Sequence, residues 1–226
     1  MPYALRGIVM SDQPFDLYGF APSVYVRSVR LALEEKALPY VLHELDPFQP
    51  GGPPAWYRSL HPFGKIPSFR DGGVELFESD AILRYLEAAY PEHPLTPSDP
   101  PGIARMTQVM RIMDGYAYPA MIWTVFVMLA RDREEGRFPL DEGLAQSRKV
   151  LDVLDRLMPQ GAEFLAGTTL TLADTHALPM LVYFAETAPG RAMLAEVPRL
   201  NDWLARMRRR RSTTATRSPL EVREGE

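Results

Sequence analysis

The chain has 226 residues, of which 46% are hydrophobic and 24% are charged. These proportions are typical of a globular protein with one large domain or two small ones. The formal net charge is −4 and there is no cysteine, so nucleic acid and anionic membranes are not expected partners, and disulfides, thiolate zinc sites and a cysteine nucleophile are excluded.

The sequence shows no sign of export or membrane insertion. Its first fifteen residues lack a basic region followed by an apolar one. No window of eighteen uncharged apolar residues is present, and the nearest candidate, residues 121–130, is too short to cross a bilayer. We therefore expect a cytoplasmic protein that does not enter a membrane.

Residues 1–92 predict a mixed α/β domain. Val26, Val29 and Leu33 recur at helical spacing between two strand-like segments, and Pro39 ends the helix. The expected elements are a strand at 15–20, a helix from about 26 to 37, a strand at 40–45, a helical turn near 56–60, a hairpin with strands around 68–70 and at 74–77, and a helix at 81–89. The order β-α-β-α-β-β-α predicts helices that cover a mixed sheet.

Residues 93–101 form the predicted linker, because five prolines fall between residues 91 and 101. The following domain, 102–226, predicts helices and no strand. Its first helical stripe is rich in methionine and is expected to be interrupted near Gly115 and Pro119 before it resumes to about residue 133.

Three later segments complete the all-helical domain. Leucines between residues 144 and 157 predict a helix, and Thr171 with Asp174 forms a capping-box pattern at the start of another. A last helix is expected at about 198–207. The arginine-rich run 206–211 reads as a solvated helix end, and we expect a disordered tail from about residue 212.

Two segments of the first domain point to a site for a small peptide. A cis bond between Ile66 and Pro67 would present the backbone N–H and C=O of Ile66 together to a peptide ligand. Glu78 and Ser79 stand where a helix begins, so a carboxylate and free N–H groups would hold the two charged ends of that ligand. The simpler alternative is a trans Pro67 and a Ser79 that only caps its helix.

With its proline-rich linker and helical second half, the chain resembles the soluble glutathione transferases from about residue 16 to residue 207. Their Asn-Pro-Phe-Gly-Gln-Val-Pro motif corresponds to His-Pro-Phe-Gly-Lys-Ile-Pro at 61–67, and their "FLAG…TLAD" stretch to residues 164–174. The resemblance implies a thioredoxin-like first domain, a cis Pro67 and glutathione as co-substrate. Glutathione would be bound by Lys65, Ile66, Pro67, Glu78 and Ser79.

The resemblance also implies an activating hydroxyl at the start of the first helix. Residues 18–26, followed by Leu-Glu-Glu-Lys at 33–36, look most like the phi pattern among the serine-type classes (phi, theta and zeta), which puts Ser23 in the catalytic position. A thiol of pKa about 8.5 is mostly protonated at pH 7, and a hydroxyl together with a helix N-terminus would stabilise its thiolate. The alternatives are that Ser23 only caps the helix, or that Tyr25 is the catalytic hydroxyl.

Several positions depart from the family pattern. Tyr25 stands where cysteine-type relatives carry their cysteine, so mixed-disulfide chemistry is not expected. Gly52–Pro53 replace the His-Lys pair that the phi pattern offers to the glycine end of glutathione, and Lys65, in place of the usual glutamine, would contact a carboxylate. The candidates for a second-substrate pocket between the halves are Tyr25, Met113, Tyr116, Tyr118 and Trp123, with core packing as the alternative for each.

The histidines show no metal-ligand spacing, and no metal is expected. We therefore expect a homodimeric, cytoplasmic glutathione transferase of the serine type, which conjugates glutathione to small apolar electrophiles in detoxification. The resemblance implies dimer contacts from the helix bearing Arg84 and the helix after the linker, with Phe48, Trp56 or Tyr57 inserted into the partner. The alternatives are another glutathione-dependent reaction (dehalogenation, ether cleavage, peroxide reduction or isomerisation) or a non-catalytic binding module.

Overall fold

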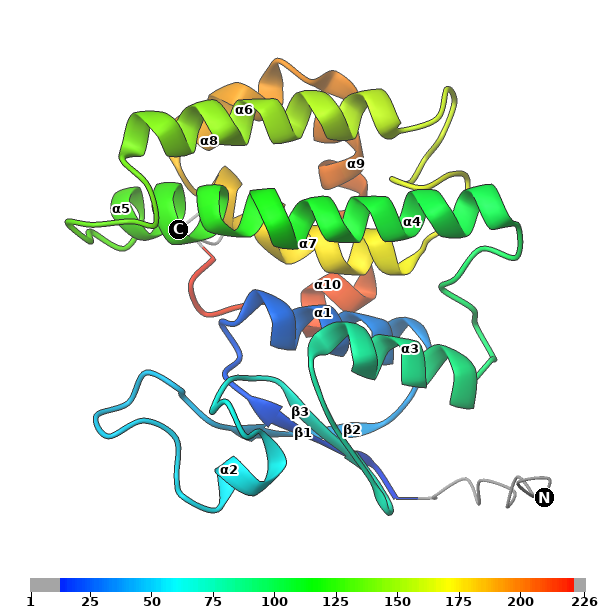
Figure 1. Ribbon diagram of the computed structural model, residues 1–226. Helices are drawn as coiled ribbons and strands as arrows, with labels where there is room; N and C mark the ends of the chain where they lie inside the picture. The colour runs from blue at the N-terminus through cyan, green and yellow to red at the C-terminus, as the bar shows by residue number, and fades with distance from the viewer. Residues whose placement is uncertain (1–12, 222–226) are drawn as a thin grey trace.

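The computed structural model describes residues 13–221 and has a small sheet with its helices at one end and a bundle of helices at the other (Figure 1). Residues 1–12, most of the segment in which no export signal was expected, and residues 222–226, the end of the expected tail, lie outside the described residues. The first half contains β1 (Phe15–Gly19), α1 (Val24–Glu35), β2 (Tyr40–Glu44), α2 (Tyr57–Leu60), β3 (Ser68–Asp71), β4 (Val74–Phe77) and α3 (Ser79–Ala89). This is the predicted order of elements.

The four strands form one mixed sheet in the order β2-β1-β3-β4. β1 is parallel to β2, because α1 carries the chain back to the same end of the sheet, whereas β3 is antiparallel to both β1 and β4. Gly72, with a φ of 54°, allows the tight turn between β3 and β4. α1 and α3 cover one face of the sheet and bury Leu17 and Phe69, while α2 lies at the opposite face (Figure 1).

The second half is all-helical, as predicted. It contains α4 (Pro100–Ile112), η1 (Met113–Phe126), α5 (Val127–Leu129), α6 (Leu140–Leu157), α7 (Leu172–Ala185), α8 (Ala188–Ala195), α9 (Pro198–Arg208) and α10 (Arg211–Ala215). α7 runs through the middle, and all 14 of its residues are buried. The predicted capping box is present at its start, where the Asp174 carboxylate accepts a hydrogen bond from the Thr171 N–H at 2.8 Å.

α4 and η1 form one continuous helical run, in which η1 winds as a π-helix. The interruption expected near Gly115 and Pro119 is therefore wrong, since the chain stays helical through both residues. Pro119 has no N–H to donate to the preceding turn, and the wider winding accommodates it. The hydroxyl of Thr124 donates to the Pro119 carbonyl at 2.9 Å, and the run ends at Leu129 rather than near residue 133.

By length and composition, the run Pro100–Leu129 is apolar enough to span a membrane. In this structure it packs against α6 and α7, and 44% of its apolar stretch is buried inside the protein. A core helix of a globular domain meets the same criteria of length and composition.

The C-terminal residues dock on α1, so the disordered tail expected from about residue 212 is wrong for the described residues. Arg211–Ala215 form α10, and Ser218 is buried. The guanidinium of Arg210 donates two hydrogen bonds of 2.7 Å to Glu35 on α1, and Arg27 on α1 forms a 2.5 Å ion pair with Glu221. These partners lie 175 and 194 residues apart in the sequence, which is why local composition does not reveal them.

Candidate functional site

The Ile66–Pro67 peptide bond is cis and directly precedes β3. Tyr57 holds the segment on both sides, because its hydroxyl donates to the Lys65 carbonyl at 2.8 Å and lies 2.9 Å from the Ser68 hydroxyl. Among the described residues, no group bonds to the backbone N–H or C=O of Ile66. Both groups are thus available to a ligand. Tyr57 itself is fully buried, so the expectation that it inserts into a partner subunit is wrong.

The N-terminus of α3 lacks a cap. Glu78 occupies the cap position with a φ of 70°, and its side chain makes no capping bond. Ser79 is the first residue of the helix rather than its cap, which contradicts the simpler alternative for that residue. The first intrahelical bond runs from the Ile82 N–H to the Glu78 carbonyl at 3.1 Å. The N–H groups of residues 79–81 therefore have no partner among the described residues, and they form a site suited to an anion.

Strand register brings these two segments together. Ser68 pairs with Phe77 across β3 and β4, so the residues just before Ser68 and just after Phe77 are neighbours at one edge of the sheet. Tyr18, near the end of β1, pairs with the same Ser68. The loop that leaves β1 toward α1 therefore starts at this edge as well.

Ser23 ends that loop and caps α1. Its side chain accepts a hydrogen bond from the Val26 N–H at 3.4 Å, which is long for such a bond. The side chain is half-buried. The structure thus confirms the capping role that the sequence offered as an alternative, and it leaves the hydroxyl proton available to an acceptor at the helix N-terminus.

Tyr25, the rival hydroxyl, lies in a different environment. Its ring is 4.7 Å from that of Tyr118 and 5.9 Å from that of His176. Burial, followed by the charge of the nearby Asp114 carboxylate, raises the pKa of the Tyr25 hydroxyl. An anion close to this hydroxyl opposes a second anion beside it, and Tyr25 is therefore poorly suited to stabilise a thiolate.

Asp114 organises the wall of η1 behind Tyr25. One of its carboxylate oxygens is 2.7 Å from His176 Nε2, and the other is 2.6 Å from the Arg111 guanidinium. His176 is fully buried. Hydrogen bonding and charge interaction with His176, and the charge of Arg111, outweigh burial and lower the pKa of Asp114. The carboxylate is held ionised between α4, η1 and α7.

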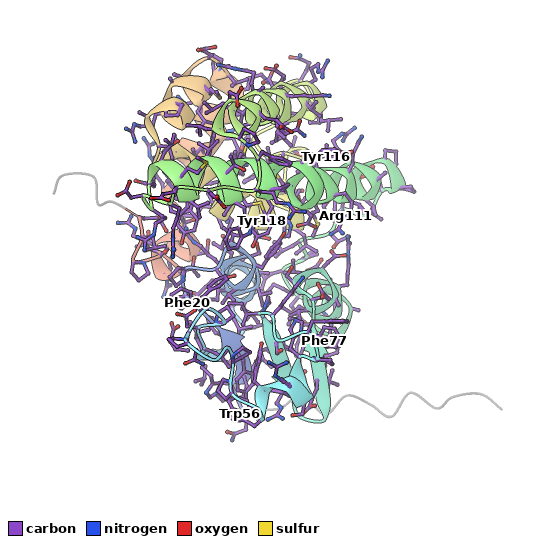
Figure 2. The ribbon with its side chains drawn as sticks, turned by 60° about the vertical axis from the view of Figure 1, so that its left-hand side comes forward. Phe20, Trp56, Phe77, Arg111, Tyr116 and Tyr118 are labelled. Atoms are coloured by element: carbon purple, nitrogen blue, oxygen red, sulfur yellow. The ribbon has the colours of Figure 1, made fainter. Side chains whose placement is uncertain are left out.

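Aromatic side chains extend from Tyr25 outward. Tyr118 lies 6.1 Å from Trp123, and Trp123 lies 5.8 Å from Phe48, which belongs to the loop between β2 and α2. Figure 2 shows this side of the molecule, with Arg111, Tyr116 and Tyr118 on the long helical run and Phe20, Trp56 and Phe77 on the sheet half. Nothing in the sequence indicated the contact between Phe48 and Trp123, because Phe48 is an isolated apolar residue in a loop and belongs to no periodic pattern.

Met113 and Tyr116 differ in solvent exposure from the other residues predicted for the second-substrate pocket. Met113 is 0% exposed and belongs to the main core, so its assignment to the second-substrate pocket is wrong. It falls on the inner side of the helical run, where the alternative of core packing holds. Tyr116 is 56% exposed, whereas Tyr25 and Tyr118 are half-buried.

His61 lies close to Lys65 and Glu78, the two charged residues that the resemblance assigns to glutathione. It is 1% exposed, and its Nδ1 has no hydrogen-bond partner among the described residues. Burial lowers the pKa of His61, with an opposing effect of Glu78 and a further lowering by Lys65. Its ring packs against Phe77 at 4.7 Å. Lys65 and Glu78 thus both lie close to the His61 imidazole, and both side chains are exposed.

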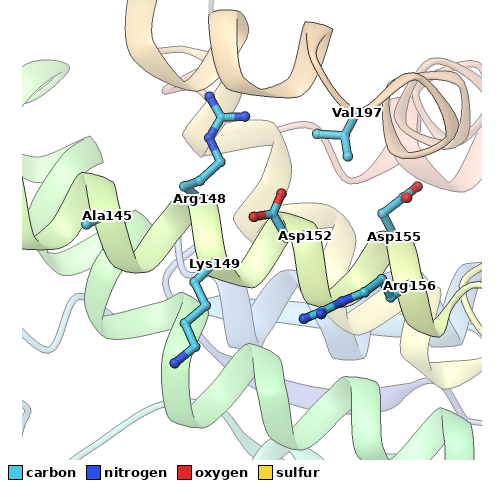
Figure 3. A pocket seen from close by; sticks show the side chains of 7 residues that line it. All are labelled: Ala145, Arg148, Lys149, Asp152, Asp155, Arg156 and Val197. Atoms are coloured by element: carbon cyan, nitrogen blue, oxygen red, sulfur yellow. The ribbon is translucent and has the colours of Figure 1, made fainter.

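A depression on the far side of the second half is a weaker candidate. It follows α6 and is lined by Ala145, Arg148, Lys149, Asp152, Asp155, Arg156 and Val197 (Figure 3). Its charges are of both signs and are partly neutralised, as Arg148 pairs with Glu196 at 2.9 Å and Asp155 with Arg199 at 3.8 Å. Among residues 13–221, no group of three or more His, Asp or Glu side chains is arranged to hold a metal ion.

Comparison with known proteins agrees with this geometry. Residues 17–94 match the glutathione S-transferase N-terminal domain, and residues 117–211 match the glutathione S-transferase C-terminal domain. Glutathione S-transferase 3 of Zea mays is 31% identical over 200 residues, which cover 84% of this chain and 87% of the relative. Glutathione S-transferase F13 of Arabidopsis thaliana is 29% identical and covers 83% of this chain and 87% of the relative.

Solved structures give the same result. The apo form of glutathione S-transferase III superimposes with a TM-score of 0.79 at 27% identity, covering 95% of this chain and 100% of the other. A glutathione S-transferase of Methylobacterium radiotolerans, solved in complex with glutathione sulfonate, superimposes with a TM-score of 0.75 at 27% identity and covers 90% of this chain and 94% of the other.

Proposed function

Because this chain belongs to the glutathione S-transferase family and is therefore a glutathione transferase, we propose that it is a serine-type enzyme in which Ser23 stabilises the glutathione thiolate. The observation that supports this most is the convergence of three features at one edge of the sheet. These are the unpaired backbone of Ile66, the uncapped N-terminus of α3, and the Ser23 hydroxyl at the N-terminus of α1.

Each feature suits a different part of glutathione. The N–H and C=O of Ile66 pair with the backbone of the cysteinyl residue, as in strand addition. The free N–H groups at the start of α3, with Ser79, bind the γ-glutamyl carboxylate, and Glu78 binds its amine. Lys65 is exposed, and like Glu78 it interacts through its charge with His61. We assign Lys65 to the glycine carboxylate.

The thiolate needs stabilisation because a free thiol of pKa about 8.5 is mostly protonated near neutral pH. Lowering that pKa by about two units requires roughly 2.7 kcal/mol of preferential interaction with the thiolate. One charge-assisted hydrogen bond from Ser23, added to the positive end of α1, is of that order.

The second substrate is an apolar electrophile that approaches along Tyr25, Tyr118 and Trp123, since aromatic walls bind flat apolar groups. Arg84 on α3 and the exposed face of α4 form the proposed dimer contact, with Phe48 or Trp56, which are 69% and 55% exposed, as inserted residues. A cytoplasmic location, a role in detoxification, and the absence of membrane or nucleic-acid partners belong to the same proposal.

The test combines glutathione binding by calorimetry with a panel of electrophiles. We expect glutathione to bind and an aryl halide to be conjugated faster than a peroxide is reduced or an ether is cleaved. Binding without any turnover on the panel would point to a non-catalytic module. Preferential peroxide reduction, dehalogenation, ether cleavage or isomerisation would assign the scaffold to another glutathione-dependent reaction.

A further inference from the structure

The peptide unit that joins Pro22 to Ser23 is hydrogen-bonded at both ends. The Ser23 N–H donates to the Phe20 carbonyl at 2.8 Å, which closes the turn before α1. The Pro22 carbonyl accepts a hydrogen bond of 2.7 Å from the hydroxyl of Tyr183 on α7. Because a peptide unit is planar, these two bonds fix the orientation of the plane that leads into Ser23.

Tyr183 is itself fixed by two other parts of the chain. Its ring stacks on Phe126 of η1 at 4.5 Å with an interplanar angle of 9°. Its hydroxyl lies 2.5 Å from the hydroxyl of Ser218, which in turn accepts the Leu220 N–H at 3.1 Å. Burial raises the pKa of Tyr183 to about 12, so its proton is retained throughout the working range of pH.

The groups at the two ends determine which atom donates in the hydrogen bonds between Ser218, Tyr183 and Pro22. The Pro22 carbonyl can only accept, so Tyr183 donates its single proton to it, and Ser218 must then donate to the Tyr183 oxygen. A chain of donors thus runs from the Leu220 N–H through Ser218 and Tyr183 to Pro22. Each bond in such a chain polarises the next and strengthens it.

The residues that carry Ser218 form a strap, defined as residues 210–221, which is attached to α1 at both ends. At one end, Arg210 and Ser212 bind the carboxylate of Glu35. At the other, Glu221 binds Arg27, which is 1% exposed and so cannot exchange this partner for water. Ser218 is therefore held in place by charge pairs on either side of it.

We propose that the strap is a positioning element of the active site, in which Ser218 and Tyr183 set the orientation of the peptide plane before Ser23 and thereby aim its hydroxyl at the thiolate. This inference rests on the proposed role of Ser23. Tyr183 and Ser218 act through Pro22 and do not touch the substrate. Without the bond to its carbonyl, the Pro22–Ser23 plane is held by the Phe20 turn alone and can rotate, so the Ser23 hydroxyl spends less time on the thiolate.

The experiment compares Tyr183→Phe, Ser218→Ala and Ser23→Ala with the wild type by titrating the ultraviolet absorbance of the bound thiolate. Tyr90→Phe is the matched control, because Tyr90 is 3% exposed like Tyr183 and donates to Asp71, in the β3–β4 hairpin. We expect Tyr183→Phe to raise the thiolate pKa by about half a unit, which corresponds to about a two- to threefold loss of turnover at pH 6.5. Ser218→Ala should shift it less and in the same direction, and the KM for glutathione should stay within about twofold in both variants.

The control separates positioning from loss of stability. Tyr90→Phe should lower the melting temperature as Tyr183→Phe does and leave the thiolate pKa unchanged. If Ser23→Ala raises the thiolate pKa but Tyr183→Phe and Ser218→Ala behave like Tyr90→Phe, the positioning role is refuted and the proposed function stands. If Ser23→Ala itself has no effect, the proposed role of Ser23 fails, and the positioning role fails with it.

Discussion

Ser23 and Tyr25 lie two residues apart on the first turn of α1, and their surroundings separate the two hydroxyls. Ser23 sits at the end of the helix with only a long hydrogen bond of 3.4 Å from Val26. Tyr25 is half-buried beside the ionised Asp114, which with burial raises the pKa of its hydroxyl. The same electrostatics that disfavour a tyrosinate at Tyr25 also disfavour a thiolate next to it, so the serine is the better assignment.

Replacing Ser23 by alanine should raise the pKa of the bound glutathione thiol by one unit or more and leave glutathione affinity nearly intact. A charge-assisted hydrogen bond is worth about 1.5–3 kcal/mol, or roughly one to two pKa units. Turnover at pH 6.5 should fall about ten- to a hundredfold and recover partly toward pH 9, where the solvent removes the proton. The measurement is a pH titration of thiolate absorbance with parallel kinetics.

Tyr25→Phe is the companion variant, since it removes the rival hydroxyl and keeps the ring against Tyr118. Its thiolate pKa should match that of the wild type. A thiolate pKa that moves only in Tyr25→Phe would assign the catalytic hydroxyl to the tyrosine.

Glu78→Ala should raise the KM for glutathione about tenfold, with a smaller effect on kcat. The γ-glutamyl end is remote from the sulfur, so its contacts are the same in the ground state and the transition state. Glu75→Ala is the control, because Glu75 is an exposed carboxylate on the neighbouring strand that pairs with Arg70 at 2.7 Å. Steady-state kinetics with varied glutathione measures both variants, and an unchanged KM in Glu78→Ala would place the γ-glutamyl site elsewhere.

At the scale of elements, α1 is the helix to which the other parts attach. It covers the sheet (Figure 1), packs against α3 and α7, and is bound by the strap at Glu35 and Arg27. In our proposal, the helix therefore links the C-terminal residues to the turn that carries Ser23. Lys36, at its far end, is 3% exposed and pairs with Glu87 on α3 at 2.8 Å, which fixes the other end of α1.

The attachment of the strap should weaken in acid. Burial tends to raise the pKa of Glu35, but hydrogen bonds from Arg210 and Ser212 outweigh it and lower the pKa below the ordinary value of 4.5. A carboxylate with a lowered pKa in the folded state stabilises the protein above the unfolded pKa, and this contribution is lost as the pH falls through the folded value. Glu35→Gln should therefore destabilise the protein at pH 7, and its stability difference from the wild type should shrink as the pH falls below 4.5.

Denaturant unfolding of both proteins from pH 7 to pH 3 measures that difference. Glu196→Gln is the control for the loss of one surface charge. Glu196 pairs with Arg148, but its side chain is 64% exposed, and exposed ion pairs contribute little to the free energy of unfolding. A stability difference for Glu35→Gln that stays constant over this range would contradict the assignment of the strap contact to the ionised carboxylate.

For the whole molecule, α3 and α4 offer the surface proposed for the dimer. A 3.4 Å hydrogen bond from Arg84 on α3 to Thr107 on α4 links the two helices, and Ile103 on α4 is 37% exposed. An isologous contact would bury this apolar side chain near the two-fold axis. The sheet half and the helical half each contribute one helix to it.

Size-exclusion chromatography with light scattering should give a dimer mass at micromolar concentration. Ile103→Asp should yield monomer, because the contact would bury an unpaired carboxylate. Leu129→Asp is the matched control, since Leu129 is an apolar residue that is 44% exposed at the end of the long helical run. A clean monomer mass for the wild type would refute the dimer, and equal dissociation in both variants would refute its location.

Resemblance to the glutathione transferases pointed to the motifs at 61–67 and 78–79. The order of elements and the capping box of α7 were determined by the sequence by itself. These features depend on local properties, namely the spacing of apolar residues, the lack of an N–H in proline, and the hydrogen bonds of residues within one helical turn. For the same reason Ser23 could be placed at the start of α1, and Glu78 and Ser79 at the start of α3, from their neighbours in the chain.

Only the tertiary structure decided which side chains meet across the fold. Met113 and Tyr57 are buried because of what packs on them, and Phe48 meets Trp123 only because the β2–α2 loop folds toward η1. The strap looks polar and disordered in sequence, yet partners on α1, 175 and 194 residues away, pair with Arg210 and Glu221. A contact between distant segments has no local periodicity, because its free energy arises only when the two surfaces meet. The hydrogen bonds that link Ser218 and Tyr183 to the Pro22 carbonyl therefore became visible only in the folded molecule.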